Sequence, residues 1–380
     1  NTLTRTLGRT SVAVATLAIG LAMLVSLAVM IGSFRQTVID WANQTLIADL
    51  WMRPIARESG GVNANFSSDL EALLNGVEGV EVVAPWSETT IDYEGVKIIL
   101  GGARFDVVRK HSNLNFLSGR KTSEVAALVH GDRCIISESL SLKQNLHRED
   151  TIRIPTSLGL KKFHIEDVYY DYVSDSGFVV IDRPVYTEVM KDNTIQNFAI
   201  FVKSNVDPLK VRTNIYEALN RGPHRSLFFI RTTGELKERI LDIFDDTFAI
   251  TYALHTISIA IAVLSVMNAL FALTDESKRE FGILKYLGIT NLSMKKLVFT
   301  QAGVLGILGS IFGVILGLIL ALILVYIINK QSFGWTIRLL IPIDFIWQTF
   351  LVVFLTSVLS ALIPARLATN TPAPEVVKSE

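Results

Sequence analysis

The sequence has almost no cysteine and no net charge. Cys134 is the one cysteine in 380 residues, so no disulfide can form within the chain. Any exported domain must therefore be held together by its own hydrophobic core. Lysine plus arginine and aspartate plus glutamate both number 36, which gives a formal net charge of zero. This balance argues against nucleic acid as the main partner.

The motifs of common enzyme sites are also missing from the sequence. There is no GxxxxGK[ST] nucleotide-binding loop, no GxSxG, no HExxH and no paired CxxC. His111, His130, His147 and His164 are scattered without metal-ligand spacing, and Cys134 lies beside isoleucines, as a buried and inert thiol would. We therefore predict a chain that is not itself an enzyme and that binds no metal and no cofactor.

Long apolar runs are what the sequence has in abundance. Half of the residues are hydrophobic and 19% are charged. A membrane span needs about 20 mostly apolar residues to cross about 30 Å of hydrocarbon. Four segments meet this length and predict transmembrane helices: residues 11–34, 246–273, 297–328 and 345–363. The first is too long for a signal peptide, so we expect a retained anchor. The start at Asn1 indicates a trimmed chain or part of a longer polypeptide.

Positive charges near the spans predict their orientation. Arg5 and Arg9 precede the first span, and Arg366 and Lys378 follow the fourth. Between the second and third spans lie Lys278, Arg279, Lys285, Lys295 and Lys296. All fall on one side if there are four spans. The positive-inside rule then places residues 1–10, 274–296 and 364–380 in the cytoplasm, and residues 35–245 and 329–344 outside.

The long segment 35–245 has the pattern of an α+β domain. Short runs rich in β-branched and aromatic residues predict strands at 80–83, 96–100, 163–170, 178–181, 198–202 and 227–230. Ser68 and Glu71 predict a capping box for one helix. Asp207 followed by Pro208 predicts another, whose buried side is Val211, Ile215 and Leu219.

Both ends of this domain are predicted to be helical stalks. The sequence 34–51 extends the first span outward, and Thr232 with Glu235 forms a capping box that opens a helix into the second span. A stiff helical stalk transmits motion, whereas a flexible linker does not. The predicted fold class is thus a membrane α-helical protein with four transmembrane helices and a large extracytoplasmic α+β domain on helical stalks.

The third span carries a stripe of small residues at intervals of four. Such a stripe lets another helix approach closely, either within the chain or in another subunit. Inside the second span, His255 is an ionisable residue that either has a function or reaches the outer interface. We predict that the helix-packing residues are Gly309, Gly313, Gly317 and Ala321.

The segment after the second span, 276–288, predicts a short amphipathic helix. Phe281, Leu284 and Leu287 recur at intervals of three among charged residues, and Gly288 is a natural left-handed terminator. Spacing alone leaves two alternatives open. The helix lies in the lipid headgroups, or its apolar side docks into a groove on a cytoplasmic partner.

Several stretches resemble the FtsX-like, or MacB-type, family of ABC transporter permeases (type VII). SKREFGILKYLGIT resembles the REIGILRALG segment after the second span of these permeases. PARLATNTPAPEVVK, at 364–378, resembles their PAxxAxxxxPxxAL tail. The stretches 133–156 and 33–51 are similar to the outer-domain and stalk patterns, and the order of one span, an outer domain and three spans also agrees. No ATPase is fused here, and the first span resembles the second half of duplicated members.

The resemblance implies partners and a set of coupling residues. A separate cytoplasmic ABC ATPase dimer would hold ATP and Mg, and this chain would bind no cofactor. A second permease unit would complete the assembly as a homodimer, a heterodimer or the other half of a fused chain. Membrane lipids and a periplasmic or lipid-anchored protein are further expected partners. The implied ATPase-coupling residues are Glu276, Lys278, Arg279, Glu280, Phe281, Gly282, Ile283, Leu284, Lys285, Leu287 and Gly288.

The resemblance also implies a function in the bacterial cytoplasmic (inner) membrane. ATP hydrolysis by the partner would move the extracytoplasmic domain, a process called mechanotransmission, to export or extract a lipid, lipoprotein, glycolipid or peptide. An alternative is a non-transporting signal relay that activates a cell-wall hydrolase or a sensor kinase. A third is a membrane-anchored enzyme with its site in the outer domain. No sequence motif names the cargo.

Overall fold

The computed structural model describes residues 7–55, 65–220, 228–276, 283, 287–341 and 343–369. These residues form two compact units. We call one the helical unit, which comprises Asn1–Phe34, Asp245–Ile328 and Arg338–Glu380. The other is the sheet unit, which comprises Arg35–Phe244 and Asn329–Ile337. We call the latter stretch, Asn329–Ile337, the outer loop.

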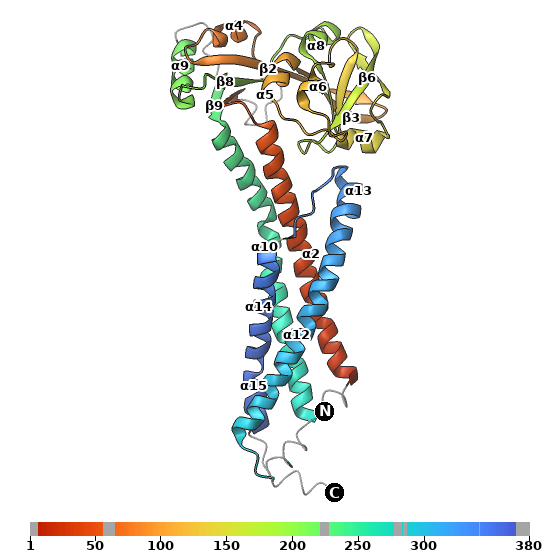
Figure 1. The fold of residues 1–380 in the computed structure, drawn as a ribbon, viewed down its shortest axis with the longest axis vertical. Helices are drawn as coiled ribbons and strands as arrows, with labels where there is room; N and C mark the ends of the chain where they lie inside the picture. The colour runs from red at the N-terminus through yellow and green to blue at the C-terminus, as the bar shows by residue number, and fades with distance from the viewer. Residues whose placement is uncertain are drawn as a thin grey trace. The chain divides into compact units, whose positions relative to one another are not determined.

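The helical unit is built from long apolar helices (Figure 1). They are α2 (Leu7–Thr45), α10 (Thr233–Glu276), α12 (Asn291–Ile323) with a π-helical turn at Leu324–Ile328, α14 (Ile343–Ser360) and α15 (Leu362–Thr369). Leu17, Leu21 and Val25 of α2 share a core with Leu305 of α12 and Val353 of α14. Helices α2 and α10 each run through both units without interruption.

Three helices are long and apolar enough to cross a membrane among the residues that the structure describes. They cover Val14–Thr45, Asn291–Ser332 and Ile346–Arg366. The remaining predicted span, 246–273, lies within the continuous helix α10, where the placement of many side chains falls outside the described set. A count of four spans therefore stays a prediction.

Within its described residues, the sheet unit contains nine strands in the order β5-β6-β4-β7-β3-β2-β8-β1-β9. Their bounds are β1 Leu50–Pro54, β2 Val80–Tyr93, β3 Val96–Ala103, β4 Arg133–Ser137, β5 Thr151–Thr156, β6 Gly159–Tyr169, β7 Phe178–Asp182, β8 Asn197–Val202 and β9 Phe228–Thr232. The helices are α4 Asp69–Asn75, α5 Phe105–His111, α6 Thr122–Ala126, α7 Glu138–Gln144, α8 Arg183–Met190, α9 Pro208–Asn220 and α13 Asn329–Phe333.

Strand β2 belongs to both halves of this sheet. Its first part, up to Trp86, pairs with β8, and its second part, from Ser87, pairs with β3. Separate hydrophobic cores form on the two halves, one with α4 and α9 beneath β1, β2 and β8, the other with α8 beneath β3, β4 and β7. Gly101 of β3 is placed where a Cβ would lie 2.5 Å from the Trp86 ring, so only glycine lets this indole cross to the neighbouring strand.

All six predicted strands are confirmed, and β1, β4 and β5 were not predicted. The capping residues Asp207 and Thr232 are confirmed. Asp207 Oδ1 accepts the N–H of Leu209 at 3.0 Å, and Thr232 and Glu235 bond each other reciprocally at 2.8 and 3.2 Å. Val211, Ile215 and Leu219 are buried as predicted.

Two predictions were wrong. A capping residue normally has extended dihedral angles, but Ser68 takes helical ones and makes no side-chain cap bond. The reciprocal bond from Glu71 is also absent, because its carboxylate binds the guanidinium of Arg104 at 3.2 Å. The first stalk was also predicted to stay helical through residue 51. Helix α2 ends at Thr45, and Leu50 and Trp51 lie in β1, whose backbone pairs with β8 on one side and β9 on the other.

Candidate functional site

The segment predicted to couple to an ATPase, 276–288, is described only in part. Glu276 ends α10, and Ile283 and Leu287 form a helical turn in which the Leu287 N–H donates to the Ile283 carbonyl at 3.0 Å. Their side chains are 49% and 72% exposed. Gly288 has a φ of +86°, the left-handed region, and the Thr290 hydroxyl then caps α12. The other predicted coupling residues lie outside the described part of the chain: Lys278, Arg279, Glu280, Phe281, Gly282, Leu284 and Lys285.

The small-residue stripe of α12 faces α2 of the same chain. A Cβ on Gly313 would lie 2.7 Å from the Leu21 side chain, and one on Gly317 would lie 2.7 Å from that of Val25. Gly309 meets Leu17 in the same way, and Ala321 is buried. The alternation of glycine on one helix with large aliphatic residues on the other brings the two backbones together. The helix partner, which spacing left open, is thus the first span.

The two stalk helices enter the sheet unit through adjacent strands. Helix α2 leads into β1, and β9 leads directly into α10, and these two strands pair along Leu50–Pro54. Thr233, the first residue of α10, accepts the Trp51 indole N–H at 3.0 Å and donates to the Ala48 carbonyl. Its own N–H donates to the Asp49 carbonyl at 3.1 Å. The ends of the stalks are therefore tied to each other by strand pairing and by side-chain bonds.

The outer loop is fastened to the sheet unit by a buried carboxylate. Glu138, the first residue of α7 and only 3% exposed, accepts the N–H of Thr336 at 2.9 Å and its hydroxyl at 2.5 Å. The Tyr172 hydroxyl donates to the Thr336 carbonyl at 2.8 Å. The Tyr172 ring also lies between those of Trp335 and Trp41, with centroid distances of 5.8 and 6.5 Å. The loop is thus connected through Tyr172 to the stalk helix α2.

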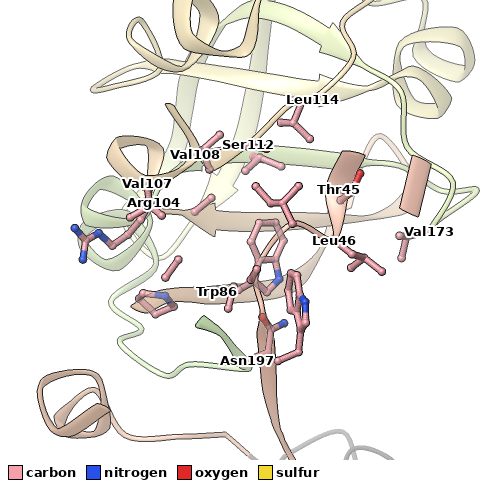
Figure 2. A pocket seen from close by; sticks show the side chains of 18 of the residues that line it. Thr45, Leu46, Trp86, Arg104, Val107, Val108, Ser112, Leu114, Val173 and Asn197 are labelled. Carbon is pink, nitrogen blue, oxygen red and sulfur yellow. The ribbon is translucent and has the colours of Figure 1, made fainter. Parts of the chain in front are cut away.

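A cavity of about 600 Å³ lies in the sheet unit beside the stalk ends. Its lining comes from β1, β2, β8 and β9, from β3, β4, β6 and β7 of the other half-sheet, from α5, and from residues near the ends of α2 and α10 that adjoin the sheet. Figure 2 shows Trp86 and Leu46 directed toward the same space as Val108, Ser112 and Leu114. The lining is mostly apolar, and this volume is typical of small-molecule sites, which span about 300–1,000 Å³.

Asp171 is a buried acid in the wall of this cavity. Burial raises its pKa from 3.8 to about 7, although the backbone N–H groups of residues 172–174 and the Trp41 indole oppose the rise. Its Oδ2 and the Trp41 Nε1 are both buried, and among the described residues neither has a hydrogen-bond partner of acceptable geometry. The buried carboxyl group therefore keeps its proton to a higher pH than an exposed aspartate does.

The structure also places several other side chains that the sequence analysis considered. Cys134 is fully buried in β4, and burial raises the pKa of its thiol, which makes it unreactive, as predicted. The His111 ring packs against the Phe201 ring in a tilted arrangement, with 4.4 Å between the ring centroids. Among the described residues, no group of three or more His, Cys, Asp or Glu could hold a metal ion. The side-chain placement of His255 lies outside the described set.

Sequence reasoning missed the cavity and the outer-loop contact. The available signal for the cavity was the alternation in β1, β2 and β8, where Trp51, Ala84, Trp86, Ala199 and Phe201 occupy alternate positions. In a sheet with one solvated face these positions would be polar. Nothing in the sequence links Glu138 to Thr336, which are 198 residues apart.

Known proteins resemble this chain over most of its length. Residues 252–373 match the FtsX-like permease C-terminal family, and residues 10–217 match the MacB-like periplasmic core domain family. An uncharacterized ABC transporter permease protein of Mycobacterium tuberculosis is 28% identical over 364 residues, which cover 95% of this chain. This chain spans 42% of the length of that relative.

Two solved structures are similar at low identity. The periplasmic region of MacB from Actinobacillus actinomycetemcomitans is 14% identical, covers 52% of this chain and 94% of its own, and has a TM-score of 0.39. The extracellular domain of the noncanonic ABC-type transporter YknZ from Gram-positive bacteria is also 14% identical, with 49% and 99% coverage and a TM-score of 0.36. The two family matches together cover both the sheet unit and the helical unit. The chain accordingly belongs to the family of ABC transporter permeases that combine an FtsX-like permease region with a MacB-like periplasmic core domain.

Proposed function

We propose that this chain is a permease unit that couples ATP hydrolysis by a separate cytoplasmic ABC ATPase to movement of its sheet unit. The ATPase would bind ATP and Mg, and a second permease unit would complete the assembly. We place the chain in the bacterial cytoplasmic membrane with the segment 274–296 inside and the sheet unit outside. The movement would export or extract a lipid, lipoprotein, glycolipid or peptide.

The observation that carries this proposal is the junction between the stalks and the sheet. Helices α2 and α10 have 39 and 44 residues, and each joins one of two directly paired strands. A continuous helix is stiff, so displacement of its inner part moves its outer end. At that end, Thr233 bonds to Trp51 and Ala48, which leaves little freedom for one helix to move without the other.

The coupling segment gives the ATPase a place to act. It follows α10 directly, so a force on 277–288 acts on the inner end of one stalk. Ile283 and Leu287, four residues apart on a helical turn, expose apolar side chains that suit a groove on a partner. A signal relay could use the same movement, but the apolar cavity beside the stalks favours handling of a small ligand.

The test is a distance measurement in the full-length protein, reconstituted with its ATPase in lipid nanodiscs. Nitroxide labels on Leu158→Cys in the sheet unit and Leu292→Cys in α12 occupy exposed sites, and buried Cys134 stays unlabelled. We expect the distance distribution between the labels to change on addition of ATP. Insertion of Gly-Ser-Gly after Asn43 in α2 should abolish that change while the ATPase remains bound.

A matched control places the same insertion after Gly131, in the exposed loop between α6 and β4 and away from both labels and the stalks. This variant should retain the full ATP-dependent change. Coupling through the stalks would be refuted if the distance still changed after the α2 insertion. It would also be refuted if ATP changed no distance in a complex that hydrolyses ATP.

A further inference from the structure

The cavity beside the stalks lies against one face of a four-strand half-sheet whose other face is a packed core. Strand register places side chains of β1, β2 and β8 alternately on the two faces. Leu50, Met52, Val83, Phe198 and Ile200 are all buried on the side of α4 and α9. Their neighbours in sequence, among them Trp51, Ala84 and Ala199, line the cavity. The cavity thus lies over the second face of this half-sheet, opposite its packed core.

Small residues in the middle of this face leave the hollow. Ala199 of β8 pairs with Trp51 of β1 on one side and with Ala84 of β2 on the other. Directly opposed residues share a face, so two alanines stand together next to an indole. A row of this kind leaves room above the sheet. Val107 and Val108 of α5 line the cavity as well.

The side chains on this face are too apolar for a solvated sheet face. An antiparallel sheet with one solvated face normally carries polar residues there. Here that face carries Trp51, Trp86, Phe201 and Phe229. Genuinely apolar cavities hold water poorly and bind apolar ligands readily. The lining therefore suits a flexible hydrocarbon better than a polar solute.

Cationic groups stand at the edge of the same face. Arg231 lies on β9, the edge strand, with its guanidinium 4.7 Å from the Phe229 ring centre. Arg53 of β1 pairs with Phe229, so it is a diagonal neighbour of Arg231 on the cavity face. Arg53 and Arg231 each have an interaction partner of their own. Three more charged residues line the cavity: Arg104, which is bound to Glu71 and Asp106, Glu88, which accepts the Trp86 indole N–H at 2.8 Å, and the buried Asp171.

We infer that this cavity binds the acyl chain of an amphiphile whose anionic head group lies against Arg53 and Arg231. The hydrocarbon occupies the hollow above Ala84 and Ala199, and the head group stays at the exposed edge beside β9. The inference rests on the proposed transport function in that it identifies the cargo, or a regulator of its movement, as an acidic lipid. Binding itself requires neither ATP nor the partner ATPase.

Photo-crosslinking tests the site in the full-length protein in lipid nanodiscs, without nucleotide. The probe is palmitic acid with a diazirine at its terminal carbon, and crosslinked peptides are identified by mass spectrometry. We expect adducts on peptides that contain β1, β2, β8 or α5, and competition by unlabelled palmitic acid. Affinity of unlabelled competitors should rise from lauric to palmitic acid, by up to about fourfold per added methylene, while the chain still gains buried contacts.

Substitutions separate the site from general partition into the nanodisc. Ala199→Trp fills the hollow and should reduce the sheet-unit adducts by about tenfold or more. Ala72→Trp, on an exposed position of α4 outside the cavity, should leave them unchanged. Replacement of both Arg53 and Arg231 by glutamine should weaken competition by palmitic acid but not by its methyl ester. The same change at Arg109, an exposed residue outside the lining, is the control.

The outcomes are distinct from those of the ATP-dependent distance measurement. Adducts confined to the membrane helices, or sheet-unit adducts that unlabelled palmitic acid does not displace, would overturn the acyl-chain site even if ATP moves the sheet unit. Equal competition by the acid and the ester in the unaltered protein would overturn the role of the arginines. Since competition is measured on the unaltered protein, a misfolded Ala199→Trp variant would not prevent a decision.

Discussion

Replacement of Asp171 by asparagine should flatten the pH dependence of stability in the sheet unit. The Asp171 carboxyl is 4% exposed, and burial raises its pKa from 3.8 to about 7. Between these two values the folded protein holds the proton and the unfolded chain does not. Stability is therefore complete below about pH 4 and is lost progressively as the pH rises to about 7, where the folded protein also releases the proton.

The size of this loss follows from the two pKa values. Their difference is about three units, and each unit corresponds to about 1.4 kcal/mol, so the penalty above neutral pH is on the order of 4 kcal/mol. Asparagine has the same shape and no charge, so it carries no such penalty. For a unit of about this size, 1 kcal/mol shifts the melting temperature by about 2–4 °C, which predicts a difference of roughly 10 °C that develops between pH 4 and pH 8.

The assay is thermal unfolding followed by tryptophan fluorescence, with the full chain in nanodiscs at a series of pH values. The informative quantity is the difference between the unaltered protein and Asp171→Asn, because other titrating groups cancel in it. Asp175→Asn, a change in the same segment at a carboxylate that is 64% exposed, is the matched control and should behave like the unaltered protein. A difference that does not vary with pH would refute the assignment of a raised pKa to Asp171.

Three further predictions concern the coupling segment, the glycine stripe and the outer loop. Glu280→Lys combined with Leu284→Asp should abolish co-purification of the ATPase while the sheet unit stays folded, and retained ATPase would contradict the coupling role. Gly313→Ala should destabilise the helical unit by about 1–3 kcal/mol in a denaturant titration because its Cβ would overlap α2. Gly303→Ala, whose Cβ would lie 4.0 Å from its nearest neighbour, should be neutral or slightly stabilising, and equal effects would count against close packing. Glu138→Gln should weaken the attachment of the outer loop by about 1–3 kcal/mol and speed hydrogen exchange of its amides about tenfold or more, and unchanged exchange would exclude this attachment.

Local signals in the sequence were sufficient for much of the fold. Thr232 and Glu235 were identified as a capping box because each needs only its neighbours three residues away. Ser68 and Glu71 have the same spacing, yet Arg104, 33 residues further on, takes the glutamate. Strand β1 was read as helix since an apolar stretch after a span continues the helical pattern, and only its pairing with β8 and β9 makes it a strand. Tertiary contacts decided these cases.

The candidate site was less accessible from the sequence because it depends on strand register. Ala84 and Ala199 form one hollow only because β2 and β8 pair at that register, and a shift of one residue would place them on the core face. The glycines of α12 were recognisable as a packing stripe. The choice of α2 as partner depends on Leu17, Leu21 and Val25, each of which lies directly opposite one of these glycines. The coupling residues remain a prediction from family resemblance, and most of them lie outside the described part of the chain.

The pairing of β1 with β9 also limits the kinds of motion that the stalks can deliver. If α2 slid along α10 by one residue at this junction, every bond of the Leu50–Pro54 ladder would have to break, and the side chains of Trp51 and Arg53 would change faces. Lengthwise shear is therefore the most costly movement of the pair. Joint tilting or joint rotation leaves the ladder intact. The pairing of β1 with β9 therefore resists sliding of one helix along the other. It permits only displacements that both helices share.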